Sequence, residues 1–256
     1  AVLAGLDAGV GGRREEPVLG ILRIQPDLDR VPGDRDPGLV EPERLAGRDA
    51  QLVGDEVSPF TCEPLGIDYP RGDPDTLFEA ARQAMPGWAA ASPNARLGVC
   101  MEIVARLYAD VFLGAQAVMH TAGQGALMSY AGSGTNALDR GVEALAYAQA
   151  AMGDVPAEAL WERRFGTTTL RLRKRYRLVP RGVAVCFACA TFPTWNAYPA
   201  MLASLATGNP VSVKPQPTAI LPMALAVRAC REVLAAAGFS PDLVTLCCDT
   251  ASDPVG

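Results

Sequence analysis

The stretch from Pro180 to Pro215 reads PRGVAVCFACATFPTWNAYPAMLASLATGNPVSVKP. Residues 182–189 are apolar throughout, which is typical of a strand in a buried parallel sheet. A turn follows, then a helix over about 198–206 and a second short strand over 210–214. This order predicts one right-handed strand–helix–strand unit.

Two polar residues stand at the predicted strand ends. Asn196 lies with Trp195 in the turn after the first strand, and Lys214 ends the second strand. Ligands of open α/β sheets bind at the carboxyl ends of the strands. An amide can donate to an oxygen that becomes negative during attack on a carbonyl, and a lysine can reach a cofactor ribose or phosphate. Taken alone, the more ordinary interpretation is that Asn196 caps the following helix and that Lys214 is a solvated loop residue.

The rest of the chain is consistent with an α/β fold. Downstream, a helix over about 219–237 and a buried strand over 243–248 complete an α/β part that we assign to residues 181–256. Residues 53–180 are mainly helical. Within them, an apolar stripe from Val99 to Val111 predicts a helix that turns Arg96 and Arg106 toward solvent.

The segment 168–178 differs from the helices around it. Its alternation of arginines with leucines predicts a strand with one basic, solvated face. That face could bind phosphate, but an oligomer surface is the more ordinary interpretation.

Residues 1–52 have a composition unlike the remainder. The run RVPGDRDPGLVEPERLAGRDAQ mixes Pro, Gly, Arg and Asp with few apolar residues. Such composition is typical of disorder, and the segment could also be foreign to the fold.

Composition excludes several classes of partner. The net charge is −5 and the sequence pI about 5.0, so neither nucleic acid nor an anionic membrane is expected as a partner. No apolar run is long enough for a transmembrane helix. Seven cysteines without framework spacing indicate reduced thiols in a cytoplasmic protein.

Three further patterns have weaker meanings. The run 132–137, GSGTNA, fits a dinucleotide fingerprint with Asp154 about 20 residues on, but no clear strand precedes it, and a flexible connecting loop is expected. Cys186 and Cys189 have redox-motif spacing, but they are expected on opposite faces of a strand and far from a helix N-terminus. His120, the single histidine, is expected to be packed or capping, and one histidine argues against zinc.

The ordered motifs together resemble the aldehyde dehydrogenase superfamily. The family shows a P-x-G-V strand, a W-N turn and an A-L-x-x-G-N run that ends in K-P. Here these correspond to PRGV at 180–183, Trp195-Asn196, and the segment from Leu205 to Lys214-Pro215. AAAGFSPDLVTL at 235–246 also resembles a family passage. The resemblance runs from about residue 53 to 250 and implies the N-terminal part of that fold, with an incomplete parallel Rossmann-like sheet.

Finer motifs resemble one branch of the family, the phenylacetic acid degradation aldehyde dehydrogenases. These motifs are TFPTWNAYP at 191–199, HTAGQ at 120–124 and VSPFTCEPLGIDYP at 57–70. The branch implies oxidation of an aldehyde formed in phenylacetate or other aromatic catabolism, by a homo-oligomer in which the segment 168–178 is the oligomerisation strand.

The resemblance implies roles for four residues. Asn196 would supply the oxyanion amide, Thr194 and Trp195 would line the cofactor cleft, and Lys214 would hydrogen-bond the adenosine ribose. The family often has Glu three residues after this Lys, where this chain has Pro217. Losing that carboxylate removes a repulsion against a 2′-phosphate, so NADP becomes more plausible than NAD.

The family's Gly-rich turn, general-base Glu and nucleophilic Cys would all lie after Gly256. The resemblance therefore implies that this polypeptide alone does not oxidise aldehydes. Two alternatives stay open: a non-catalytic remnant that binds a nucleotide or a subunit, and a dehydrogenase of the same fold that acts on acyl-CoA thioesters.

Overall fold

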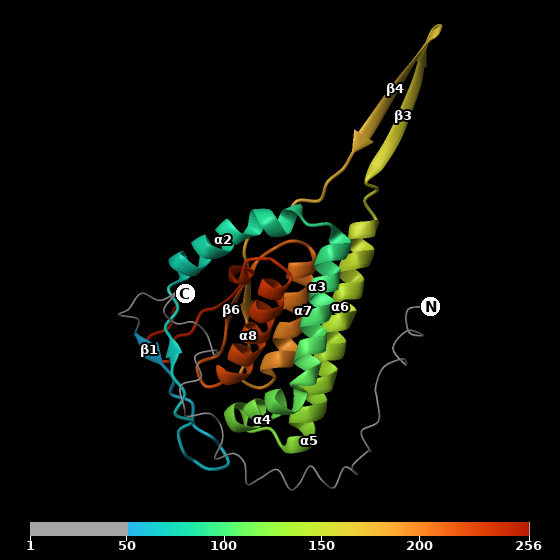
Figure 1. Ribbon diagram of the computed structural model, residues 1–256. Helices are drawn as coiled ribbons and strands as arrows, with labels where there is room; N and C mark the ends of the chain where they lie inside the picture. The colour runs from blue at the N-terminus through green and yellow to red at the C-terminus, as the bar shows by residue number, and fades with distance from the viewer. Residues whose placement is uncertain (1–50, 256) are drawn as a thin grey trace. The chain divides into compact units, whose positions relative to one another are not determined.

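The computed structural model of the protein describes residues 51–255 (Figure 1). The prediction for residues 1–52 therefore falls almost wholly outside the described residues. The elements in chain order are β1 (Leu52–Val53), β2 (Tyr69–Pro70), α2 (Pro74–Ala90), α3 (Pro93–Ala109), α4 (Val111–Ala122), α5 (Ala126–Met128), η4 (Ser129–Thr135), α6 (Asn136–Gly153), β3 (Glu158–Phe165), β4 (Thr168–Arg175), β5 (Ala184–Phe187), α7 (Pro193–Ala206), β6 (Val211–Lys214), α8 (Leu221–Ala236), η5 (Pro241–Leu243) and β7 (Val244–Leu246).

The predicted strand–helix–strand unit and the predicted third strand are confirmed. The first strand was expected to be buried throughout, which is wrong, because Val185 and Phe187 of β5 are 46% and 68% exposed. β5, β6 and β7 form a parallel sheet in that order, with Ala184 opposite Val211 and Val211 opposite Val244. The crossovers are α7 and α8. The carboxyl ends of the three strands, together with the residues that follow each strand directly, form one edge of the sheet, here called the carboxyl edge.

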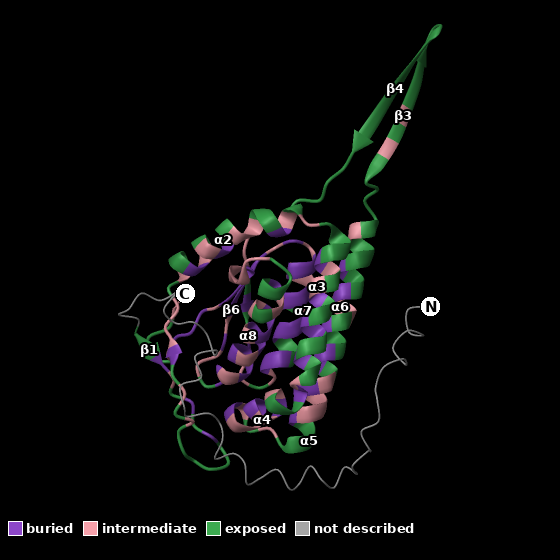
Figure 2. Cartoon of the chain, in the orientation of Figure 1, coloured by how far each residue is buried: buried purple, intermediate pink, exposed green. Residues whose placement is uncertain are grey.

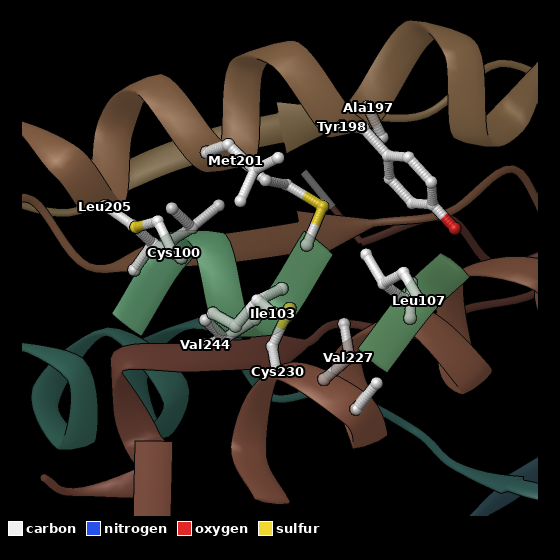
Figure 3. Packing of buried hydrophobic residues seen from close by; sticks show 14 of the residues in the cluster. Cys100, Ile103, Leu107, Ala197, Tyr198, Met201, Leu205, Val227, Cys230 and Val244 are labelled. Carbon is white, nitrogen blue, oxygen red and sulfur yellow. The ribbon is translucent and has the colours of Figure 1, made fainter. Parts of the chain in front are cut away.

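The main core lies where α3, α7 and α8 meet one face of this sheet. Figure 3 shows side chains of α3 between α7 and α8, with Val244 of β7 beside them. The labelled members of the cluster are Cys100, Ile103, Leu107, Ala197, Tyr198, Met201, Leu205, Val227, Cys230 and Val244. Burial of these apolar side chains is the main force that holds the helices on the sheet.

The first turn of α7 corrects one sequence prediction. The helix begins at Pro193, so Trp195 and Asn196 belong to its first turn rather than to a turn before it. Proline suits this position because the first helical residue needs no N–H partner and its φ is already helical.

Arg96 corrects another prediction. The helical stripe placed it in solvent, but it is 5% exposed. Its guanidinium donates to the carbonyl oxygens of Ala206 at 3.0 Å and Ala91 at 2.6 Å. Ala206 is the last residue of α7, whose end carbonyls have no partner within the helix. Desolvation of the buried guanidinium lowers the pKa of Arg96.

The run GSGTNA is not a loop. Its first four residues, Gly132–Thr135, lie in the π-helical segment η4, and Asn136 begins α6. Gly134 packs closely here, because a Cβ at this position would lie 2.9 Å from a methyl group of Val111. The dinucleotide fingerprint is therefore not formed at this place, since no strand precedes the helix.

The predicted strand 168–178 forms over Thr168–Arg175 as one strand of a hairpin, and its partner strand β3 was not predicted. Register pairs Trp161 with Leu172 and Glu162 with Arg171. Figure 2 shows the hairpin almost entirely exposed, and Figure 1 shows it extending away from the helices. Cross-strand ion pairs join Arg171 to Glu162 at 2.6 Å and Arg175 to Glu158 at 3.1 Å.

Alternation gives the hairpin two different faces. Trp161, Phe165, Leu170 and Leu172 share one face, and the ion-paired residues lie on the other. The prediction of a strand with a basic, solvated face is confirmed, and its apolar face is exposed as well.

No helix within residues 51–255 is long and apolar enough to cross a membrane.

Candidate functional site

Asn196 lies at the carboxyl edge, in the first turn of α7 just after β5. Its Oδ1 accepts a hydrogen bond from the backbone N–H of Cys189 at 3.2 Å, which orients the amide. The side chain is exposed, and none of the described residues accepts from its NH₂ group. Asn196 thus has two N–H donors available to a bound molecule.

Thr194 and Trp195 flank this amide in different ways. The Thr194 hydroxyl is buried and donates to the carbonyl oxygen of Ser133 in η4 at 2.5 Å. It therefore ties α7 to η4. Trp195 is 45% exposed beside Asn196, which leaves its indole free to contact a ligand. The cleft-lining role expected of both residues stays a prediction.

Lys214 ends β6 at the same edge. It lies opposite Phe187 of β5, and its carbonyl accepts from the N–H of Ala188 at 2.9 Å. The structure thus brings Lys214 and the Cys189–Asn196 pair to adjoining strand ends, as the sequence predicted. Their roles in binding and catalysis remain predictions.

An acidic residue that the sequence reasoning missed holds the Lys214 ammonium group. Nζ of Lys214 lies 2.7 Å from Oδ2 of Asp249, and the two side chains are 17% and 0% exposed. The same Oδ2 accepts from the N–H of Val255 at 2.8 Å. Oδ1 of Asp249 is buried and has no hydrogen-bond partner among the described residues. The sequence did offer a sign of this role, because Asp249 follows the third buried strand almost directly, at the edge where ligands bind.

Close packing at Gly72 brings a second charged residue, Arg71, to the end of β7. Arg71 pairs with Cys248 as a short parallel bridge, and the N–H of Gly72 donates to the Cys248 carbonyl at 2.8 Å. A Cβ on Gly72 would lie 2.7 Å from Cα of Cys247, so this close crossing requires glycine. Arg71 forms an ion pair with Asp253 at 2.7 Å.

The cysteines are free thiols in different surroundings. Cys186 lies in the core, where burial raises the pKa of its thiol to about 11. Cys189 was expected far from a helix N-terminus, which is wrong because α7 starts early. Its sulfur accepts from the N–H of Phe192, the residue before α7, at 3.4 Å. These two cysteines have redox-motif spacing, but the thiol of Cys186 is buried in the core, which argues against a redox pair.

His120 is packed, as predicted. It lies in the last turn of α4, with Nδ1 2.8 Å from the Ser58 hydroxyl and its ring edge-on to Phe60. Burial lowers the pKa of its imidazole. The described residues include no group of three or more His, Cys, Asp or Glu side chains that could hold a metal ion.

The carboxyl edge fits part of a dinucleotide. The Lys214 ammonium has three donors, and Asp249 is its partner among the described residues, so donors remain for ribose hydroxyls. A carboxylate oxygen without a partner lies beside it. The open donors of Lys214 suit a ribose better than an apolar ligand.

Comparisons with known proteins show which family the chain is similar to. A family model described as "Aldehyde dehydrogenase family" matches residues 55–255. An NAD-dependent aldehyde dehydrogenase from Burkholderia multivorans is 43% identical with a TM-score of 0.76, over 84% of this chain and 41% of that one. This chain thus spans about two fifths of that relative's length. No curated protein sequence matches.

More distant structures share the fold alone. A betaine aldehyde dehydrogenase from Staphylococcus aureus in complex with NAD⁺ is 20% identical with a TM-score of 0.60, over 78% of this chain and 38% of that one. A glyceraldehyde-3-phosphate dehydrogenase from Methanocaldococcus jannaschii complexed with NADP is 14% identical with a TM-score of 0.60, over 79% and 42%.

Proposed function

Because the chain belongs to the aldehyde dehydrogenase family, we propose that it supplies the oxyanion donor and the ribose contact of an enzyme that oxidises an aldehyde to a carboxylic acid with NAD or NADP. The observation that carries the proposal is the placement of Asn196 and Lys214 at adjoining strand ends of one parallel sheet. Among the described residues we assign neither a nucleophile nor a general base.

Asn196 is the catalytic residue of the proposal. Its Oδ1 is held by the backbone of Cys189, so its NH₂ group has a set direction. When a nucleophile adds to an aldehyde, the carbonyl oxygen gains negative charge. A donor already aimed at that oxygen lowers the barrier by about 3 kcal/mol.

Lys214 is the cofactor-binding residue of the proposal, and Trp195 and Thr194 are proposed to line the cofactor cleft. Its remaining N–H groups hydrogen-bond the hydroxyls of the adenosine ribose. The dinucleotide, when bound, accepts the hydride that leaves the aldehyde carbon. The 43% identity to an NAD-dependent relative supports this assignment.

The proposed substrate is an aldehyde of phenylacetate or other aromatic breakdown. The support is the likeness of three segments, at 57–70, 120–124 and 191–199, to that branch of the family. The first two segments meet in the structure, because Ser58 bonds to His120. We place the protein in the cytoplasm, which fits its free thiols.

A homo-oligomer is proposed on the strength of the hairpin. Two-stranded hairpins with one exposed apolar face are marginal by themselves. Trp161, Leu170 and Leu172 would be covered by a second copy of the chain, while the ion-paired face stays in solvent.

Two alternatives predict different behaviour. A non-catalytic nucleotide-binding chain would bind NAD and show no turnover in any longer form of the protein. An acyl-CoA-linked dehydrogenase would require coenzyme A for turnover.

Calorimetric titration with NAD and NADP tests the proposal. The chain has two lysines, so Lys214→Met is matched by Lys174→Met on the exposed hairpin. We expect Lys214→Met to weaken dinucleotide binding about tenfold or more, since it removes a charged donor, and Lys174→Met to leave binding unchanged. A folded chain that binds neither dinucleotide contradicts the proposal. We assign no described residue as the nucleophile. Turnover of phenylacetaldehyde by the purified chain would contradict this.

A further inference from the structure

The buried ion pair between Lys214 and Asp249 has a consequence for cofactor choice. The Lys214 ammonium is partly open to solvent, and the Asp249 carboxylate is enclosed behind it. At 2.7 Å the carboxylate neutralises the charge of the ammonium group but occupies one of its three donors. The remaining donors can serve a neutral hydroxyl, while the pair as a whole offers no net positive charge.

We propose that Asp249 is a specificity-determining residue that makes this site select NAD over NADP by neutralising Lys214. The proposal rests on the function proposed above, in which Lys214 contacts the adenosine ribose. NADP carries a phosphate on the ribose 2′-hydroxyl, and such a dianion needs an uncompensated cation. Asp249 acts through Lys214. It disfavours a 2′-phosphate, an effect that Pro217 cannot supply because it has no carboxylate.

The surroundings do not restore a positive charge. Arg71 is a second cation at the end of β7, and its guanidinium is paired with Asp253 at 2.7 Å. Asp73, the N-cap residue of α2, adds a further carboxylate. Lys214, Asp249, Asp73 and Arg71 all interact electrostatically with the thiol of Cys247, and Asp253 joins the group through its ion pair with Arg71. Two cations and three carboxylates leave this cluster with an excess of negative charge.

The orphaned oxygen of Asp249 is a second, independent observation. Buried carboxylate oxygens normally have a hydrogen-bond partner, and Oδ1 has none among the described residues. Because this atom is enclosed, a water molecule that bridges it to a ribose hydroxyl would satisfy the acceptor, whereas a phosphate would place like charges together.

Binding constants for NAD and NADP test the inference without any need for turnover. The wild-type chain is expected to bind NAD at least about tenfold more tightly than NADP. Asp249→Asn leaves Lys214 charged and uncompensated, so NADP affinity should rise about tenfold relative to NAD. A merely structural role for Asp249 would weaken both cofactors alike. The gain should also fall with salt, because it comes from charge.

Two controls sharpen the result. Asp139→Asn makes the same charge change on an exposed carboxylate of α6, outside the group of charges around Lys214, and should leave the cofactor ratio unchanged. The double variant Lys214→Gln/Asp249→Asn removes both charges and should lose the NADP gain.

The outcomes separate the two proposals. A wild-type chain that binds both cofactors equally, or prefers NADP, overturns the inference and leaves the proposed function standing, whether or not the variant folds. An unchanged ratio in Asp249→Asn also overturns it. Binding of neither cofactor to the folded wild-type chain overturns both.

Discussion

The Oε1 atom of Glu56 lies 2.6 Å from the backbone nitrogen of Ile220, although 164 residues separate them in the sequence. The same oxygen accepts from the N–H of Leu221 at 2.9 Å, and Oε2 accepts from the Tyr69 hydroxyl at 2.6 Å. Glu56 is 1% exposed. A carboxylate from the N-terminal segment therefore caps the start of α8, where free N–H groups and the helix dipole favour an anion.

Replacing Glu56 by Ala should destabilise the chain by about 2–4 kcal/mol, since it leaves buried N–H groups without an acceptor. Glu56→Gln should recover more than half of that loss. Burial raises the pKa of Glu56, so a neutral acceptor of the same shape avoids a desolvation cost. Urea denaturation measures both variants, with exposed Glu63→Ala as control. An Ala variant as stable as wild type would contradict this role.

Replacing Arg96 by Met should cost about 2–3 kcal/mol, because the end carbonyl of α7 at Ala206 loses its donor. Arg106→Met on the same helix is the matched control. Arg106 is exposed, with surface ion pairs to Asp110 and Glu232, and should cost at most about 1 kcal/mol. Equal losses in the two variants would show that Arg96 does not act as a cap.

Lowering the pH from 7.5 to 5.5 should destabilise the chain through His120. Burial holds the pKa of folded His120 below 6.5, so the unfolded chain takes up the proton first. The contribution to stability is complete above pH 6.5 and is lost as the pH falls through the folded pKa. One proton limits the slope to about 1.4 kcal/mol per pH unit.

His120→Gln removes this dependence while an amide can still bond to the Ser58 hydroxyl. His120 is the single histidine, so the variant isolates its contribution. Denaturation midpoints at several pH values supply the measurement. A slope that persists in the variant would assign the pH dependence to other groups.

Leu172→Ser should weaken self-association through the hairpin, because it removes an apolar side chain from the face that carries Trp161. Arg173→Ser is the matched control, at the next position and on the opposite face. Light scattering coupled to size exclusion gives the mass of each. We expect dissociation about tenfold easier for Leu172→Ser, as for loss of one well-buried apolar contact. Equal masses of the two variants across a dilution series would show that the hairpin is not part of the interface.

Much of the α/β part was predictable because its signals are local. The apolar run around Cys186, the helix up to Ala206 and the strand ending on Lys214 each appear near their predicted places. Helix starts were less accurate. Pro193 begins α7 earlier than the apolar pattern indicated, since a proline inside the helix at Pro199 obscured its first turn.

Contacts between distant segments were not predictable. The position of Arg96 on its helix predicted a side chain in solvent. It is buried because it donates to the carbonyl of Ala206, the last residue of a helix that ends 110 residues later. Asp249 was not predicted as a site residue, because an acidic residue after a strand is common in any protein. Its importance comes from its ion pair with Lys214, which the sequence does not reveal.

By itself, the sequence determined the order of strands and helices in residues 180–250 and the family motifs that end on Asn196 and Lys214. These follow from periodicity, caps and turn residues, which act over a few positions. The tertiary structure alone decided which charges meet, namely Lys214 with Asp249 and Glu56 with the start of α8. The reason is physical: a buried charge is stable only beside a partner, and packing of distant segments, rather than local pattern, brings that partner near.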